Sequence, residues 1–167
     1  MGPPCSQPWE HVADYVIERR LWLPRPRPDV FEFFADPRNL ARVSPSWAAP
    51  VWLTDPPARL AVGPLLDFRP RALPSRWRVI VREFDPPYRF VDVQLRGPFA
   101  RWEHRHRFLE GPAAEDGTGP AGTWIEDRIT YRLPLGPLGR AVHGVLLGWR
   151  LDALFRLRER RLREIFA

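Results

Sequence analysis

The chain has 167 residues, 44% of them hydrophobic, which is the length and composition of one domain with a single core. No apolar stretch approaches the roughly 20 residues that cross a bilayer, and the first ten residues lack the apolar core of a secretory signal. All 26 basic residues are arginines, and with 20 carboxylates the net charge is +6. The charges are spread along the chain, without a block of like charges.

Residues 1–10 are rich in proline, glycine and serine, so we expect a disordered leader there and a single folded domain over 11–167. Cys5 is the only cysteine. A lone cysteine excludes an internal disulfide and a metal site built from cysteines, and it suits a cytoplasmic protein.

The first elements follow from alternation and from capping residues. Apolar and polar residues alternate over Tyr15–Leu23, which predicts a strand that Pro24 ends. Asp29 is a candidate N-cap for a short helix, and Asp36–Val43 is expected to form a second short turn or helix that Ser44-Pro45 closes. The first of these helices carries Val30, Phe31, Phe33 and Phe34.

Further strands and one long helix complete the chain. Short turns of glycine, proline or aspartate bound the strand-like runs, whereas residues 111–122 form a longer hairpin loop. From about Leu138 apolar residues recur at helical spacing to the C-terminus. The predicted strands are Pro50–Leu53, Leu65–Arg69, Trp77–Phe84, Arg89–Leu95, Phe99–Leu109 and Trp124–Leu133.

This order of elements predicts an α+β fold. Strands joined by short turns pair in an antiparallel sheet, and the sheet is expected to curve around the long C-terminal helix, with two short helices after the first strand. Such a sheet, covered on one face, leaves space for a small-molecule cavity beneath the helix.

The clearest candidate site lies on the run from Ala100 to Phe108. Successive side chains of a strand face opposite sides, so its arginines and glutamate face solvent and its other side chains face inward. Asp127 and Tyr131 belong to the more apolar face of the following strand. The expected inward set on the first of these strands is Trp102, His104, His106 and Phe108.

Asp92 and Gln94 are ambiguous. They alternate with Val91, Val93 and Leu95, so hydrophobicity alone turns the two polar side chains outward.

Several of these motifs together resemble a branch of the SRPBCC superfamily, the START-like domains with a helix-grip fold. The resemblance extends from about Tyr15 to the C-terminus. It implies a hydrophobic cavity between sheet and helix, which in the superfamily holds lipids, hormones or polyketides and in some members performs aromatase or cyclase chemistry. It also places Asp92 and Gln94 among the motif positions, against the hydrophobic pattern. The matching residues are Arg89–Gln94, Gly97-Pro98-Phe99, Trp102, His104, His106, Phe108, Gly122-Thr123, Asp127 and Tyr131.

Three interpretations of the inward polar residues stay open. His104, His106 and Asp127 are donors that zinc accepts. Either histidine is also a candidate general acid or base, with Asp127 fixing its tautomer. The third interpretation, which we favour, is a buried hydrogen-bond network that includes Gln94 and orients the polar end of a ligand.

We therefore expect a binding protein for a small hydrophobic molecule with a polar or anionic end, with no resident metal or cofactor. A cyclase, dehydratase or hydrolase that uses a His–Asp pair is the alternative. The expected ligand-binding residues are Trp77, Gln94, Trp102, His104, His106, Phe108, Asp127 and Tyr131.

Other partners are less well supported by the sequence. The arginines over 156–163 invite a nucleic-acid interpretation, but acidic residues stand four positions away along the same helix, as on a self-paired solvated face. Nucleic acid is therefore not the expected partner. A homodimer through an exposed sheet edge is compatible with the sequence.

Overall fold

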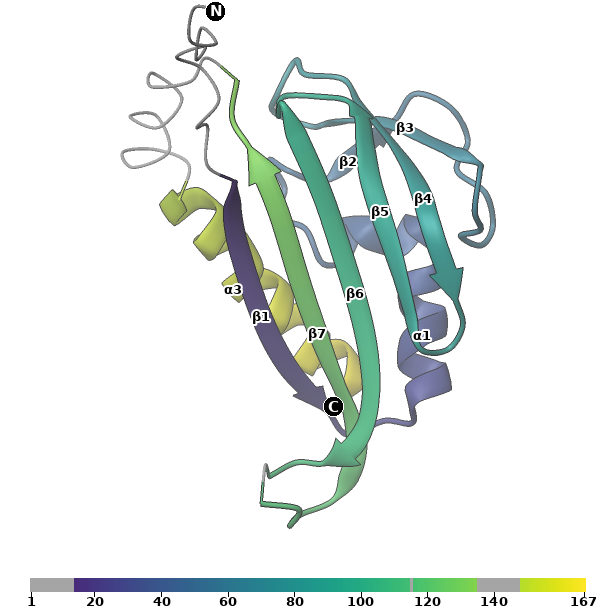
Figure 1. The fold of residues 1–167 in the computed structure, drawn as a ribbon, viewed down its shortest axis with the longest axis vertical. Helices are drawn as coiled ribbons and strands as arrows, with labels where there is room; N and C mark the ends of the chain where they lie inside the picture. The colour runs from purple at the N-terminus through teal and green to yellow at the C-terminus, as the bar shows by residue number, and fades with distance from the viewer. Residues whose placement is uncertain (1–13, 115, 135–147) are drawn as a thin grey trace, which may run out of the picture.

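A computed structural model describes residues 14–114, 116–134 and 148–167, and its main element is one antiparallel sheet (Figure 1). The sheet has seven strands in the order β1-β7-β6-β5-β4-β3-β2. The long strands β6 and β7 pair along their whole length, from Arg101 opposite Arg132 to Pro112 opposite Ala121. The strands are β1 (Tyr15–Leu23), β2 (Pro50–Trp52), β3 (Leu65–Pro70), β4 (Trp77–Asp85), β5 (Arg89–Arg96), β6 (Arg101–Pro112) and β7 (Ala121–Arg132).

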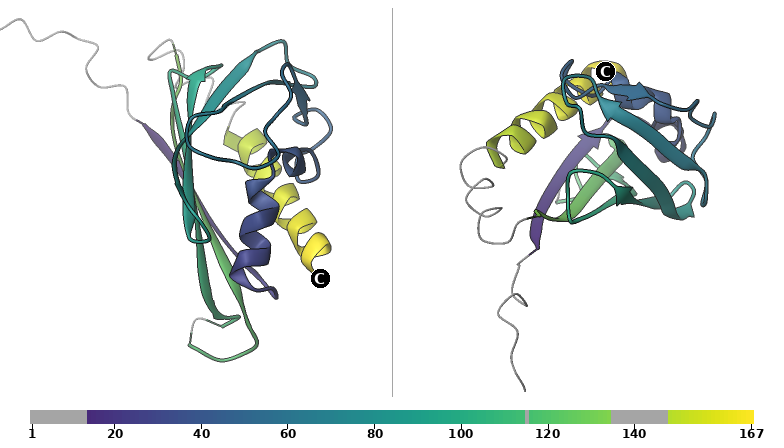
Figure 2. Two further views of the ribbon diagram at one scale, coloured as in Figure 1. Left: turned by 90° about the vertical axis from the view of Figure 1, so that its right-hand side faces the viewer. Right: turned by 90° about the horizontal axis from the view of Figure 1, so that it is seen from above.

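The helices lie on one side of the curved sheet (Figure 2). They are α1 (Arg27–Ala35), the short 3-10 helix η1 (Pro37–Ala41) and the long α3 (Gly148–Phe166). This is the expected architecture, a curved antiparallel sheet around a C-terminal helix with two short helices after the first strand. None of the helices among the described residues is long and apolar enough to span a membrane.

Local details differ from the expectations. The predicted cap at Asp29 is wrong, because α1 begins at Arg27 after Pro26 and Asp29 lies inside its first turn. Proline at the start of a helix gives up no hydrogen bond there, so Pro28 helps to set this earlier boundary. The predicted leader and the predicted helix between Leu138 and Leu147 lie outside the described residues.

The core consists of two apolar clusters on the helix side of the sheet. One gathers around α1, β3, β4 and the end of α3, with Phe31 and Phe108 at its centre. The other joins Trp102 and Tyr131 of the sheet to Leu151 at the start of α3. On β6, His104 and His106 stand between Trp102 and Phe108, so polar side chains separate the two clusters along this strand, whereas Trp77 of β4 packs against both clusters.

Polar contacts hold α3 over the sheet at its margins. Arg19 of β1 forms an ion pair with Asp152 at 2.5 Å. Arg161 donates hydrogen bonds to the carbonyl oxygens of Arg42 and Ser44, at 3.0 and 3.3 Å. These contacts fix α3 to the edge strand β1 on one side and to the segment after η1 on the other, with the space between α3 and the sheet lying between the two sets of contacts.

The β6–β7 hairpin allows a test of packing at one glycine. A Cβ atom added to Gly122 would lie 2.3 Å from the carbonyl oxygen of Leu23 and 2.6 Å from the Trp22 ring. Its register partner Gly111 would meet only the Trp124 ring, at 3.4 Å.

We therefore expect Gly122→Ala to lower the free energy of unfolding by about 1–3 kcal/mol, because backbone must move to admit the methyl group. Gly111→Ala is the matched control and should cost clearly less. Chemical denaturation of both variants measures the difference, and equal losses would contradict this account of the hairpin.

Candidate functional site

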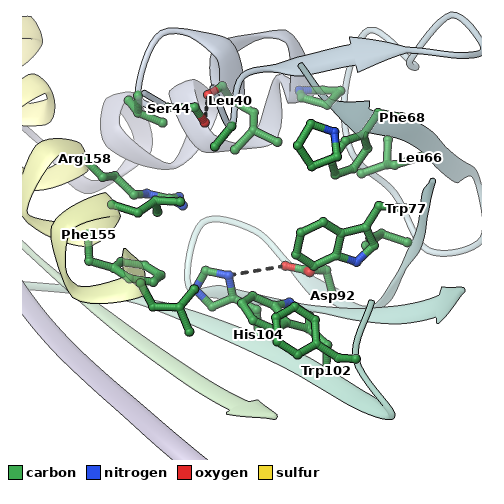
Figure 3. A pocket seen from close by; sticks show the side chains of 18 of the residues that line it. Leu40, Ser44, Leu66, Phe68, Trp77, Asp92, Trp102, His104, Phe155 and Arg158 are labelled. Carbon is green, nitrogen blue, oxygen red and sulfur yellow. Dashed lines mark hydrogen bonds and ion pairs between the residues drawn. The ribbon is translucent and has the colours of Figure 1, made fainter. Parts of the chain in front are cut away.

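A cavity of about 540 Å³ lies between the concave face of the sheet and the helices α1, η1 and α3 (Figure 3). Its volume falls in the range of about 300–1,000 Å³ that small-molecule sites occupy. Most of its wall is apolar. The apolar wall includes Phe34, Leu40, Leu66, Phe68, Trp77, Val79, Trp102, Leu154 and Phe155.

Aromatic rings form one continuous side of this wall. Phe68 of β3 stacks on Trp77 of β4 with 5.9 Å between ring centroids, and Trp77 meets Trp102 of β6 edge to face at 5.3 Å. The strands supply these rings from one face, because β3, β4 and β6 alternate in and out. The indole nitrogen of Trp77 is buried and donates to no acceptor among the described residues.

Two buried polar side chains of the wall come from the middle of β6. His104 and His106 are 6% and 3% exposed, and their rings lie 3.8 Å apart. Both line the cavity. Behind them lies Asp127 of β7, 8% exposed, which pairs with His106 in the strand register.

Asp127 contacts both histidines. Its Oδ1 lies 2.6 Å from Nδ1 of His106 and 3.5 Å from Nε2 of His104. The two ring nitrogens and the carboxylate oxygen make no well-aligned hydrogen bond in the described structure, so the short contact with His106 is an ion pair with poor angular geometry.

Burial and these contacts shift the pKa values of the two neighbouring histidines in opposite directions. Burial lowers the pKa of His104, and the neighbouring His106 lowers it further. Burial is the largest influence on His106 and opposes its charged form, but the charge of Asp127 and the interactions with Asp127 and Asp92 together raise the pKa of His106. Burial alone would raise the pKa of Asp127, yet the charges and contacts of His106 and His104 together hold it well below its usual range. The site thus combines a neutral His104 with an ion pair of His106 and Asp127.

Asp92 of β5 faces the same two histidines from the cavity side. Its Oδ2 lies 3.6 Å from Nε2 of His106 and 3.9 Å from Nδ1 of His104. Figure 3 shows Asp92 directed towards His104. The prediction of an outward Asp92 from hydrophobicity alone is wrong, and the inward position implied by the resemblance agrees with the structure.

Two arginines of α3 line the cavity, the exposed Arg150 and the half-buried Arg158. Arg158 lies opposite His104 (Figure 3). Its guanidinium lies over the Phe34 ring, 5.3 Å from the centroid. Its Nε is buried without a hydrogen bond, and no carboxylate of the described residues lies within ion-pair distance. Among the described residues the helix therefore presents an arginine without a carboxylate partner to a largely apolar space.

The predicted ligand-binding residues fall into two groups. Trp77, Trp102, His104 and His106 line the cavity. The other four are described but do not line it, and they support the wall instead. Phe108 lies in the apolar core, Tyr131 packs against Trp102, Asp127 stands behind the histidines, and the Gln94 amide donates to the Phe99 carbonyl at 2.7 Å.

The sequence interpretation missed Arg158, although its spacing carried a signal. Leu151, Phe155, Arg158 and Leu162 follow one another at intervals of four, three and four residues, which places Arg158 in the buried stripe of α3. Grouping it with the solvated arginines of the helix concealed this position.

We expect Asp127→Asn to lower the free energy of unfolding by about 3 kcal/mol near pH 6.5, because it removes the nearer of the two carboxylates that face the buried His106. The pKa of His106 is raised in the folded protein. The stabilisation that protonated His106 provides is therefore complete at pH values below the pKa of His106 in the unfolded chain, about 6.5, and it is lost as the pH rises through the pKa in the folded protein. The loss caused by the substitution should therefore be smaller near pH 9. Denaturant unfolding at both pH values measures it.

The matched control is Glu126→Gln, one residue earlier on the solvent face of β7, where Glu126 pairs with Arg20 and Arg107. Such an exposed pair should cost no more than about 1 kcal/mol. A loss for Asp127→Asn as small as that of the control, or one that grows towards alkaline pH, would contradict the assigned charge states.

Solved structures share this architecture at low sequence identity. A START superfamily protein from Mycobacterium smegmatis superposes with a TM-score of 0.63 at 14% identity, over 90% of this chain and 98% of that chain. The protein TTHA0849 from Thermus thermophilus has a TM-score of 0.60 at 19% identity, over 93% and 100% of the two chains. CV1439 from Chromobacterium violaceum has a TM-score of 0.60 at 14% identity, over 90% and 96%. These likenesses show the fold.

A search of curated proteins finds no match to this sequence. The family model described as polyketide cyclase / dehydrase and lipid transport matches residues 23–155, which include α1, η1, β2–β7 and the first part of α3. The superfamily suggested by the sequence motifs is thus confirmed: the chain belongs to the START-like family of polyketide cyclases, dehydrases and lipid transport proteins.

Proposed function

We propose that this protein binds a small hydrophobic molecule with an anionic end in the cavity between the sheet and α3. The observation that carries the proposal is Arg158, a cation in the wall of a largely apolar cavity with no carboxylate partner among the described residues. A buried charge without a partner costs free energy. A carboxylate or similar group on a ligand would supply that partner.

The apolar body of the ligand would lie against the aromatic side of the wall. Phe68, Trp77 and Trp102 present ring faces and edges to the cavity, which suits a planar or polycyclic molecule as well as an acyl chain. The unpartnered indole N–H of Trp77 is a second donor in the wall. A ligand that carries one further acceptor oxygen would satisfy it.

The histidine side would contribute polarity rather than a second fixed cation. His104 is neutral, and the charge of His106 is already balanced by Asp127. Of the two arginines that line the cavity, Arg150 is exposed, so the half-buried Arg158 is the group that would select for negative charge. His104 and Asp92 can exchange hydrogen bonds with a hydroxyl or carbonyl of the ligand.

We expect Arg158→Met to weaken binding of lipophilic carboxylic acids by about 10- to 100-fold, which is what a lost charge-assisted hydrogen bond costs. Binding of the matching alcohols or methyl esters should change little, because methionine keeps the apolar stem. Displacement of a fluorescent fatty-acid probe measures both series.

The matched control is Arg156→Met, two residues earlier on the same helix, where the guanidinium is exposed and pairs with Asp152. That variant should bind both series as the wild type does. Trp102→Ala should weaken acids and alcohols alike. If Arg158→Met kept the preference for acids, Arg158 would not be the group that recognises the anion.

His104 supports a second candidate function, acid–base catalysis in the same cavity. Its imidazole is neutral, lines the cavity and lies between the carboxylates of Asp92 and Asp127, so it can accept a proton from a bound molecule. Incubation with β-hydroxy carbonyl compounds followed by mass spectrometry separates the candidates. Loss of water that requires His104 would support an enzyme, whereas recovery of unchanged ligand would support binding alone.

A further inference from the structure

We propose that Asp92, His104 and His106 form a site for a divalent transition-metal ion, open to the cavity. Each residue offers one ligand atom, and the three atoms lie within 4.8 Å of one another. Oδ2 of Asp92 is 3.6 Å from Nε2 of His106 and 3.9 Å from Nδ1 of His104. The residues come from the adjacent strands β5 and β6, where Asp92 and His104 are direct register partners.

The spacing is close to what a metal ion requires. Bonds of about 2.0–2.1 Å in a tetrahedral zinc site separate neighbouring ligand atoms by about 3.3 Å. The carboxylate oxygen would therefore have to approach the two nitrogens by only a few tenths of an ångström. Asp92 is partly exposed, with 18% of its side chain accessible, and has room for that movement.

Asp127 lies on the side of the two rings away from Asp92. Its Oδ1 contacts Nδ1 of His106 at 2.6 Å and Nε2 of His104 at 3.5 Å, without a well-aligned hydrogen bond to either. The nitrogens that remain are Nε2 of His106 and Nδ1 of His104, the two that lie towards Asp92. Histidines that bind metals almost always have a carboxylate or carbonyl at their other ring nitrogen. Asp127 is placed to serve both rings in this way.

Charge and chemistry define the class of ion. Two imidazoles and a carboxylate suit zinc, or iron(II) and its neighbours, rather than calcium or magnesium. A metal ion at Nε2 of His106 would displace the proton from that nitrogen, after which the charges of Asp92 and Asp127 would both face the divalent ion. Asp92, His104 and His106 all line the cavity, so positions left open by three protein ligands would face a molecule bound there.

This site differs from the one that the sequence suggested. The sequence offered Asp127 as the third ligand of His104 and His106, but Asp127 lies behind the rings and Asp92 lies in front. The proposal goes beyond ligand binding, because its test contains no organic ligand and can succeed or fail independently.

The experiment is titration of the chelator-treated full chain with Co²⁺, followed by visible absorption, and then displacement of Co²⁺ by Zn²⁺. We expect one Co²⁺ per chain, with the intense visible bands of a four- or five-coordinate ion. Asp92→Asn and His104→Gln should each weaken Co²⁺ binding by at least about 10-fold. Circular dichroism and thermal unfolding of the metal-free variants establish that they are folded.

The remaining histidines, His11 and His143, lie outside the described residues and provide the control. A chain carrying both His11→Gln and His143→Gln should bind Co²⁺ as the wild type does. The proposal is overturned if the wild type shows no cobalt bands at submillimolar Co²⁺. It is also overturned if folded Asp92→Asn binds Co²⁺ as tightly as the wild type, or if the bands disappear in the double control.

Discussion

The ion pair between His106 and Asp127 is the contact on which the cavity depends. Both side chains are buried, and each would be costly to keep charged without the other. His106 and Asp127 lie halfway along β6 and β7, at positions where apolar side chains would join the two apolar clusters into one continuous core. The two apolar clusters consequently lie on either side of the pair, and the space between them has a polar floor. The mutual neutralisation of His106 and Asp127 lowers the cost of keeping this polar floor buried when no ligand is bound.

The cavity also depends on how α3 is held. Its contacts with β1 and with the segment after η1 lie at the margins, through Arg19 with Asp152 and through Arg161 with two backbone carbonyls. The apolar stripe of the helix contains Arg158 where a large apolar residue would have filled space. The helix is therefore fastened at its edges and incompletely packed in its middle. That combination preserves a volume that uniform packing would remove, and it aims one guanidinium into that volume.

Sequence reasoning located the histidine pair because β6 alternates cleanly, with charged residues on every outward position from Arg101 to Arg107. It could not orient β5 in the same way. Both faces of that strand carry valine or phenylalanine, and the ladder with β4 shifts register between Val81 and Glu83, so the hydrophobic pattern placed Asp92 on the wrong face. The resemblance to START-like proteins oriented Asp92 correctly. Alternation predicts which side chains point inward, but packing between the sheet and the helices decides which of them reach the cavity. Phe108 and Tyr131 point inward as predicted, yet they lie in the apolar core and do not line the cavity.

The two proposals concern opposite walls of one space, and electrostatics links them. Arg158 on α3 faces the cluster on the sheet and opposes the protonation of His106. A metal ion held by Asp92 and the histidines would add a second positive charge across the cavity from Arg158, and the two cations would repel each other. An anionic group bound between them would be attracted by both and would reduce that repulsion. Coupling between two sites is reciprocal: a metal ion that tightens binding of an anionic ligand must itself be held more tightly when that ligand is present, and a neutral analogue of the same shape would lack this mutual effect.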